Sequence, residues 1–143
     1  MNQVAEFRAH DLTELQTVAE RLASRIKMGD WIWLEGDLGA GKTALVRAMM
    51  RAWGYQGEVT SPTYLIMNEY ELWGRKVYHI DGFRLEGRAS EVWDPQALEE
   101  GICLVEWPQN TGLRPERFQW KIEISANPQS NERLIRLISK PFC

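Results

Sequence analysis

In the first third of the chain, the apolar positions predict a helix, then a buried strand, then a second helix. Between residues 12 and 26, seven apolar positions recur every three or four residues, which predicts an amphipathic helix with Asp11 as N-cap and Glu14 in a capping-box position. The continuous apolar run 31–34 is typical of a strand buried on both faces. A second amphipathic helix is predicted from Lys42 to Trp53.

The remainder of the chain predicts short extended segments joined by tight turns. In order, these segments are residues 58–72, 76–81, 102–106, 121–124 and 134–138. Trp73-Gly74 fits a hairpin turn, and a short helix is expected from Ser90 toward Glu99. Strands that alternate with helices and end in an antiparallel hairpin indicate the α/β class.

Composition and charge narrow the class of protein. Of 143 residues, 44% are hydrophobic and 26% are charged, as expected for a single globular domain that spans residues 1–143. The net charge of −3 argues against tight independent binding to DNA or RNA, which needs a basic surface. No run approaches the length of a membrane span or resembles a signal peptide, so we expect a cytoplasmic location. Cys103, inside an apolar run, is predicted to be a buried thiol.

The segment Gly36-Asp37-Leu38-Gly39-Ala40-Gly41-Lys42-Thr43 matches the Walker A pattern G-x-x-x-x-G-K-[ST]. Its glycines let the backbone turn so that N–H groups point inward at a helix N-terminus, where they bind phosphate. Lys42 would reach the β- and γ-phosphates, and the Thr43 hydroxyl would bind Mg²⁺. The sequence therefore predicts a P-loop NTPase-like three-layer α/β sandwich, with a mainly parallel central sheet and antiparallel additions.

A P-loop enzyme also needs an acidic residue at the end of a neighbouring buried strand, to hold the Mg²⁺ hydration shell. Asp81 ends the predicted strand 76–81, and Glu106 ends the strand 102–106. Both remain candidates for the catalytic carboxylate. His79 shares a strand face with Asp81, and a packing role and a functional role suit it equally well.

Four motifs, taken in order, resemble the bacterial TsaE family, also called YjeE. They are Gly36-Asp37-Leu38-Gly39-Ala40-Gly41-Lys42-Thr43, Ser61-Pro62-Thr63-Tyr64, His79-Ile80-Asp81-Gly82-Phe83-Arg84-Leu85 and Leu104-Val105-Glu106-Trp107-Pro108. Tyr64 and Phe83 stand where the family usually has Phe and Tyr. Because all four motifs occur in this order in so short a chain, they identify the family far more specifically than the Walker loop alone does.

The resemblance implies an ATPase with an atypical sheet topology that uses ATP and Mg²⁺. Family members act in the synthesis of threonylcarbamoyladenosine in tRNA, where they hydrolyse ATP and reset a complex of the proteins TsaB and TsaD. TsaB and TsaD would then be the partners, and tRNA would be contacted only indirectly, in agreement with the acidic pI of about 5.5. The functional positions of the family correspond here to Lys42, Thr43, Thr63, Asp81, Glu106 and Trp107.

A small-molecule kinase that uses the same loop is the alternative function. Kinases need an acceptor pocket and usually a lid with several arginines. The segment after Glu106 offers Arg114 and Arg117 but no clear lid. The sequence contains no guanine-reading Asn-Lys-x-Asp motif, which favours ATP as the nucleotide.

Overall fold

The structure, a computed structural model, describes residues 2–37, 39–60, 62, 67–82, 100–108, 111, 113 and 115–140. Its strands are β1 (Asn2–Ala9), β2 (Trp31–Glu35), β3 (Met67–Leu72), β4 (Arg75–Asp81), β5 (Ile102–Glu106), β6 (Trp120–Ala126) and β7 (Arg133–Ser139). Its helices are α1 (Leu12–Ala23), α2 (Lys42–Ala52) and the short 3-10 helix η4 (Pro115–Arg117).

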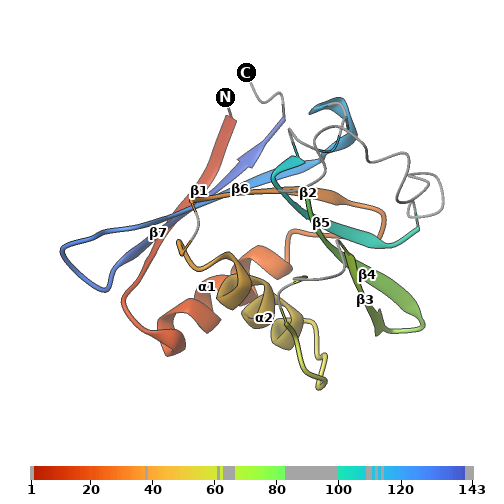
Figure 1. Cartoon of the computed structure of the whole chain (residues 1–143), viewed down its shortest axis with the longest axis horizontal. Helices are drawn as coiled ribbons and strands as arrows, with labels where there is room; N and C mark the ends of the chain where they lie inside the picture. Colours follow the sequence, from red (N-terminus) through yellow and green to blue (C-terminus); the bar gives the residue numbers. More distant parts are fainter. Residues whose placement is uncertain are drawn as a thin grey trace.

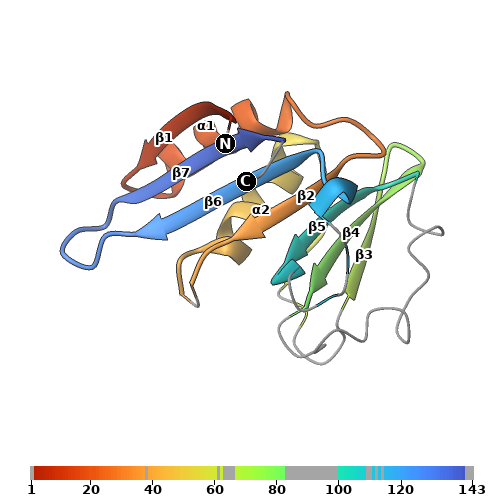
Figure 2. The same ribbon diagram turned by 90° about the horizontal axis from the view of Figure 1, so that it is seen from above.

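All seven strands belong to one sheet in the order β1-β7-β6-β2-β5-β4-β3, which can be followed across Figure 2. The four central strands β6, β2, β5 and β4 run parallel, whereas β1, β7 and β3 pair antiparallel with their neighbours. The predicted α/β class, with a parallel centre and antiparallel additions, is therefore confirmed. The helix expected from Ser90 toward Glu99 lies outside the described residues.

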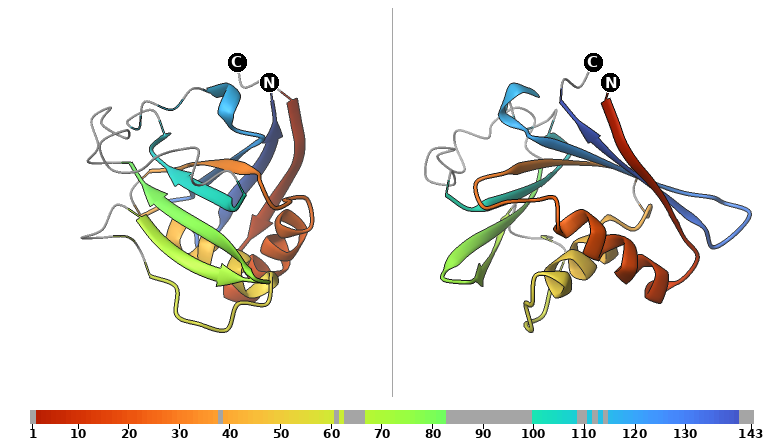
Figure 3. Two further views of the ribbon diagram at one scale, coloured as in Figure 1. Left: turned by 90° about the vertical axis from the view of Figure 1, so that its right-hand side faces the viewer. Right: turned by 180° about the vertical axis from the view of Figure 1, so that it is seen from behind.

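Helices α1 and α2 pack side by side on one face of the sheet (Figures 1 and 3). The Asp11 carboxylate accepts a hydrogen bond from the backbone N–H of Glu14 at 2.8 Å, as predicted for the N-cap. The Glu14 carboxylate accepts from the N–H of His10 at 2.6 Å, one residue earlier than in a standard capping box. The indole N–H of Trp53 donates to the carbonyl of Ala23 and ties the C-terminal ends of both helices together.

One apolar cluster packs against each face of the sheet. Ile32, Leu34 and Leu104 belong to the larger cluster, between the sheet and the helices. The smaller cluster covers the opposite face; its buried members are Trp31, Tyr78, Ile80, Cys103, Val105 and Phe118. Burial raises the pKa of the Cys103 thiol to about 12, which agrees with the predicted buried cysteine and makes it a poor nucleophile.

Strand β1 was not predicted from the sequence. Its inward positions Ala5 and Phe7 alternate with the polar residues Glu6 and Arg8, but alanine and glutamate are poor strand formers. The strand is stabilised by antiparallel pairing with β7, more than 120 residues away. Among the described residues, no helix is long and apolar enough to cross a lipid bilayer.

We expect Asp11→Ala to destabilise the fold by about 0.5–2 kcal/mol, because it removes the hydrogen-bonding side chain at the start of α1. The free energy of unfolding should be measured by urea denaturation. Glu20→Ala, at an exposed position within the same helix, is the matched control and should change stability little. Equal effects of the two substitutions would contradict a capping role for Asp11.

Candidate functional site

The loop with the Walker A pattern (residues 36–43) connects the end of β2 to the start of α2, and we call it the phosphate loop because phosphate is predicted to bind there. Gly39 and Gly41 have φ angles of 82° and 106°, a left-handed conformation that favours glycine. The N–H of Ala40 donates to the carbonyl of Asp37 at 3.0 Å. No side chain caps α2, and its first turn contains no acidic residue, so this helix N-terminus suits an anion. Leu38, the remaining loop position expected to contact phosphate, lies outside the described residues.

Gly36 fixes where the loop leaves the sheet. A Cβ atom at this position would lie 2.6 Å from the backbone oxygen of Ile124 on β6, closer than real Cβ contacts allow. Only glycine therefore lets the chain leave β2 so close to β6. The first glycine of the Walker pattern thus serves this close approach rather than a left-handed turn.

The Lys42 side chain points back over the loop and is nearly buried, with 6% of its surface exposed. Its Nζ atom donates to the carbonyl of Gly36 at 2.5 Å and lies 3.6 Å from Oε1 of Glu106. It also lies 4.8 Å from the centre of the Trp107 ring, within the range of a cation–π contact. The structure therefore brings together three of the residues that the sequence singled out.

Glu106 and Asp81 end neighbouring parallel strands and pair directly across the ladder. β5 also borders β2, where Leu34 pairs with Glu106, whereas β4 lies one strand further from the loop. Glu106 is 5% exposed, and Asp81 is only partly buried. Because its strand borders β2, Glu106 is the candidate carboxylate that contacts Lys42.

Trp107 follows Glu106 with a φ angle of 53°, which is uncommon for a residue with a bulky side chain. This conformation ends β5 and turns the indole toward Lys42. Gly82, directly after Asp81, donates its N–H to the carbonyl of Glu106 at 2.8 Å. This hydrogen bond joins the two strand ends at the site. The left-handed backbone of Trp107 is locally strained, and such strain often marks functional positions.

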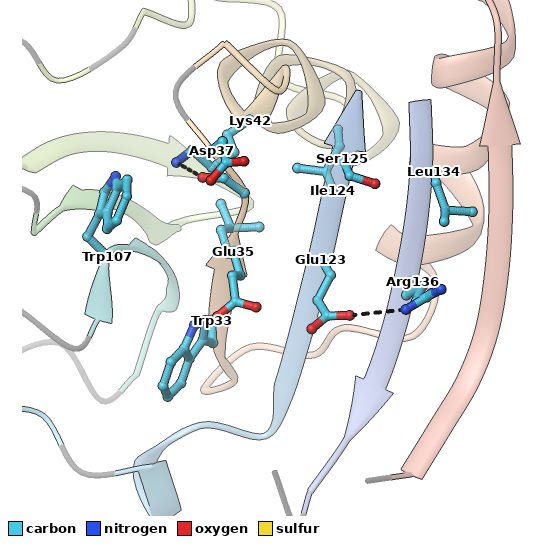
Figure 4. Close-up of a pocket in the computed structure, with 12 residues that line it drawn as sticks. Trp33, Glu35, Asp37, Lys42, Trp107, Glu123, Ile124, Ser125, Leu134 and Arg136 are labelled. Atoms are coloured by element: carbon cyan, nitrogen blue, oxygen red, sulfur yellow. Dashed lines mark hydrogen bonds and ion pairs between the residues drawn. The ribbon is translucent and has the colours of Figure 1, made fainter. Parts of the chain in front are cut away.

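A pocket of about 490 Å³ opens beside the loop. Figure 4 shows Lys42 and Trp107 at one end of it, with Trp33, Glu123 and Arg136 further along the strands. Arg136 forms an ion pair with Glu123 on the neighbouring strand at 3.9 Å. The pocket therefore joins the phosphate loop to the charged face of the sheet that lies opposite the helices.

A second pocket, of about 220 Å³, lies on the other side of the loop, between the start of α1 and the turn between β6 and β7. Its lining residues are Ala9, His10, Asp11, Leu12, Leu15, Gly41, Ala44, Ile124, Asn131 and Arg133. Leu12 is 75% exposed and offers an apolar surface next to the loop. Except for Gly41, these residues were not predicted to form a site, because Asn131, in the turn, and Arg133, at the start of β7, are far from the loop in sequence.

His10, at the edge of this second pocket, bridges two carboxylates. Its Nδ1 lies 3.0 Å from Glu14 and its Nε2 lies 3.0 Å from Glu132. The hydrogen bond to Glu14, helped by the charges of Glu14 and Glu132, raises the pKa of His10 above 6.5. A hydrogen bond from Arg8 is the main cause that lowers the pKa of Glu132.

The described residues contain no cluster of three or more His, Cys, Asp or Glu side chains that would hold a metal ion by itself. Thr43, in the first turn of α2, and Glu106 offer oxygen atoms near the loop. This set suits Mg²⁺, which usually takes one or two protein ligands and completes its shell with water and phosphate. Thr63, a further functional position that the resemblance implies, lies outside the described residues.

The arginines considered for a kinase lid are not both described. Arg114 lies outside the described residues. Arg117 packs over the ring of Trp31 at 4.7 Å, at the start of β2, whereas the phosphate loop follows the end of that strand. Arg117 is therefore not placed to close over the loop.

Comparison with known proteins places the chain in a family. The profile described as "Threonylcarbamoyl adenosine biosynthesis protein TsaE" matches residues 9–135. The chain belongs to the TsaE family. The resemblance inferred from the four motifs is thereby confirmed, and Lys42, Asp81, Glu106 and Trp107 all lie within the matched span.

Relatives from distant bacteria share most of the chain. The tRNA threonylcarbamoyladenosine biosynthesis protein TsaE of Synechocystis sp. is 37% identical over 118 residues, covering 78% of this chain and 75% of its own. The protein of the same name from Haemophilus influenzae is 38% identical over 120 residues, covering 76% and 70%. The crystal structure of YdiB from Bacillus subtilis superposes with a TM-score of 0.70 at 29% identity, covering 94% of this chain and 84% of that one.

We expect His10 to stabilise the fold only at acidic to neutral pH. Since its folded-state pKa is raised above 6.5, its favourable ion pairs are fully present below the unfolded pKa and are lost as pH rises through the folded pKa. His10→Gln should therefore lower the free energy of unfolding at about pH 5.5 and have little effect at about pH 9. Urea denaturation at both pH values tests this, and an effect confined to the higher pH would contradict it.

Proposed function

We propose that the chain is a Mg²⁺-dependent ATPase, built as one domain, that serves threonylcarbamoyladenosine modification of tRNA in the cytoplasm by acting on the TsaB–TsaD complex. The observation that carries the proposal is the position of Lys42, between the Gly36 carbonyl and the Glu106 carboxylate. It puts the P-loop lysine beside an acidic strand end in a chain of the TsaE family. Both features are those that phosphoryl-transfer sites require.

In this proposal the backbone of the loop and the start of α2 bind the phosphates, and Lys42 neutralises their negative charge. Thr43 and Glu106 would hold Mg²⁺, which supplies further positive charge at the phosphate oxygens when it is bound. Glu106 places a carboxylate close to the loop, and Asp81 places a second carboxylate one strand further away. Binding therefore depends mainly on the backbone and Lys42, whereas turnover depends on the carboxylates.

The 220 Å³ pocket could hold the adenine and ribose of the nucleotide. It begins at Gly41 and Ala44, next to the phosphate-binding backbone, and extends to the exposed apolar side chain of Leu12. Leu12 offers a surface on which a base can pack, and Asn131 and Arg133 offer polar groups. Small-molecule sites usually combine such apolar walls with a few polar groups. We assign the adenine and ribose to this pocket.

The 490 Å³ pocket supports a role for partner proteins. It is an open pocket whose lining includes Trp107, Trp33 and the charged residues Glu123 and Arg136, and a site that does not exclude water is expected to be a slow catalyst. TsaB and TsaD would complete the environment of the γ-phosphate. Binding of tRNA by the chain itself is not needed for this role, in agreement with the net charge of −3.

We expect the isolated chain to hydrolyse ATP far more slowly than the usual enzyme range of about 1–10³ per second, and TsaB–TsaD to accelerate it. Lys42→Ala should lower turnover by about 100-fold or more, because it removes the charge that faces the phosphates. Phosphate release with and without the partners measures both effects. Lys27→Ala, an exposed lysine substitution, is the control. Phosphate transfer to a metabolite would instead support the kinase, and full ATPase activity of folded Lys42→Ala would refute the proposed site.

Glu106 and Trp107 should separate nucleotide binding from function. Glu106→Ala should still bind a fluorescent ATP analogue but lose about 100-fold in hydrolysis, because the loop backbone and Lys42 remain. Trp107→Ala should keep most of its nucleotide affinity and fail in tRNA modification with TsaB–TsaD present, because a partly exposed aromatic beside the site suits a protein interface.

The controls for these two variants come from the β3–β4 hairpin. Glu71→Ala removes an exposed strand carboxylate, and Trp73→Ala removes an indole that is 65% exposed. Neither should change nucleotide binding, hydrolysis or modification. If Glu106→Ala and Trp107→Ala also kept full activity, the strand-end pair would serve packing alone.

A further inference from the structure

His79 is fully buried, with 0% of its surface exposed. It lies on β4, two residues before Asp81 and on the same face of the sheet. Unlike Lys42 and Trp107, it does not line the 490 Å³ pocket. A direct contact between His79 and a ligand in that pocket is therefore not supported, and its effect on the site must pass through a neighbouring side chain.

That neighbour is Glu106. Nε2 of His79 lies 2.5 Å from Oε2 of Glu106, the distance of a strong hydrogen bond to a charged acceptor. The other oxygen, Oε1, faces Nζ of Lys42 at 3.6 Å. The carboxylate is thus held between two partners on opposite sides: a histidine from the core and a lysine from the phosphate loop.

The strand register explains why this contact forms. In the parallel ladder His79 pairs with Leu104, and Asp81 pairs with Glu106. His79 and Glu106 are therefore diagonal neighbours on one face, and the imidazole reaches forward to the strand end. Nδ1 of His79 is buried and has no hydrogen-bond partner within the part of the chain that the structure describes. A proton on Nε2 rather than Nδ1 satisfies this environment best, because it leaves no buried N–H without an acceptor.

A carboxylate at a strand end needs such support to act precisely. Glutamate has three rotatable side-chain bonds, and fixing them costs conformational entropy. Buried partners that orient a ligand or catalytic group commonly change activity or metal affinity by about 10–100-fold when they are removed. Packing alone would not require a histidine, since an apolar residue would fill the same volume without burying an unpaired nitrogen.

We propose that His79 is a positioning residue that donates from Nε2 to Glu106 and holds its carboxylate so that Oε1 faces Lys42 and the phosphate-binding loop. This inference rests on the proposed ATPase function for its effect on turnover. The orientation of Glu106 is a property of the chain itself and can be tested without nucleotide.

Three variants distinguish the effect of losing the hydrogen bond from the effect of changing the side-chain volume. His79→Leu fills the site without a donor. His79→Gln keeps an N–H donor close to the position of Nε2. Val77→Ala opens a cavity two residues earlier on the same strand and face, at a residue that is 0% exposed and belongs to the core cluster rather than to the site. Melting temperatures identify variants that lose the fold. If His79→Leu does not fold, His79→Asn, whose amide stops short of Glu106, replaces it.

With Mg²⁺, ATP and TsaB–TsaD present, we expect His79→Leu to lower kcat by about 10–100-fold while affinity for a fluorescent ATP analogue stays close to that of the wild type. His79→Gln should recover most of the lost kcat, and Val77→Ala should leave kcat unchanged even if it lowers the melting temperature more. Wild-type kcat in His79→Leu, or no recovery in His79→Gln, would overturn the proposal.

A second readout does not depend on turnover. Crystal structures of the nucleotide-free variants should show the Glu106 carboxylate displaced in His79→Leu and kept in place in His79→Gln. An unchanged Glu106 in His79→Leu would overturn the positioning role. If the wild-type chain hydrolysed no ATP with its partners, the proposed function would fail, while the crystal structures would still decide whether His79 orients Glu106.

Discussion

The arrangement around the phosphate loop depends on one constraint, the compensation of the Lys42 ammonium group inside the protein. Burying an unpaired ammonium costs on the order of several kcal/mol, and 6% of this side chain is exposed. Three electron-rich groups surround it: the Gly36 carbonyl, the Glu106 carboxylate and the Trp107 ring. They come from the start of the loop, from the last residue of β5 and from the residue after it. The charge is therefore compensated only when β2 and β5 pair in the observed register.

The strand ends around this charge are fixed by backbone contacts rather than by side chains alone. Gly36 passes so close to β6 that no Cβ would fit, and Gly82 hydrogen-bonds to Glu106. Trp107 takes a left-handed conformation to leave β5. These contacts restrict the geometry of the site before any ligand binds, which is how preorganised sites reduce the cost of binding and reaction.

Sequence patterns predicted the local elements well and the neighbour relations less well. The loop, both helices and the strand ends with Asp81 and Glu106 follow from periodicity and motifs within short segments. Strand order is not encoded in such segments, so the sequence favoured Glu106 only slightly and left Asp81 as a second candidate for the carboxylate beside the loop. The contact between His79 and Glu106 depends on β4 lying next to β5 and was missed for the same reason. The pocket near His10 needs β1, α1 and the β6–β7 turn together, and β1 has a composition that hides its strand pattern.

The strand order also gives the two carboxylates different environments. They pair directly across the ladder, and two like charges at that separation destabilise each other unless a cation is near. One such cation, Lys42, lies beside Glu106, and His79 holds the other oxygen of the same carboxylate. Asp81 ends a strand that does not border β2 and is more exposed. In the proposed ATPase, Glu106 is thus the carboxylate that acts at the phosphates, whereas Asp81 acts from one strand further away, where water can bridge the distance.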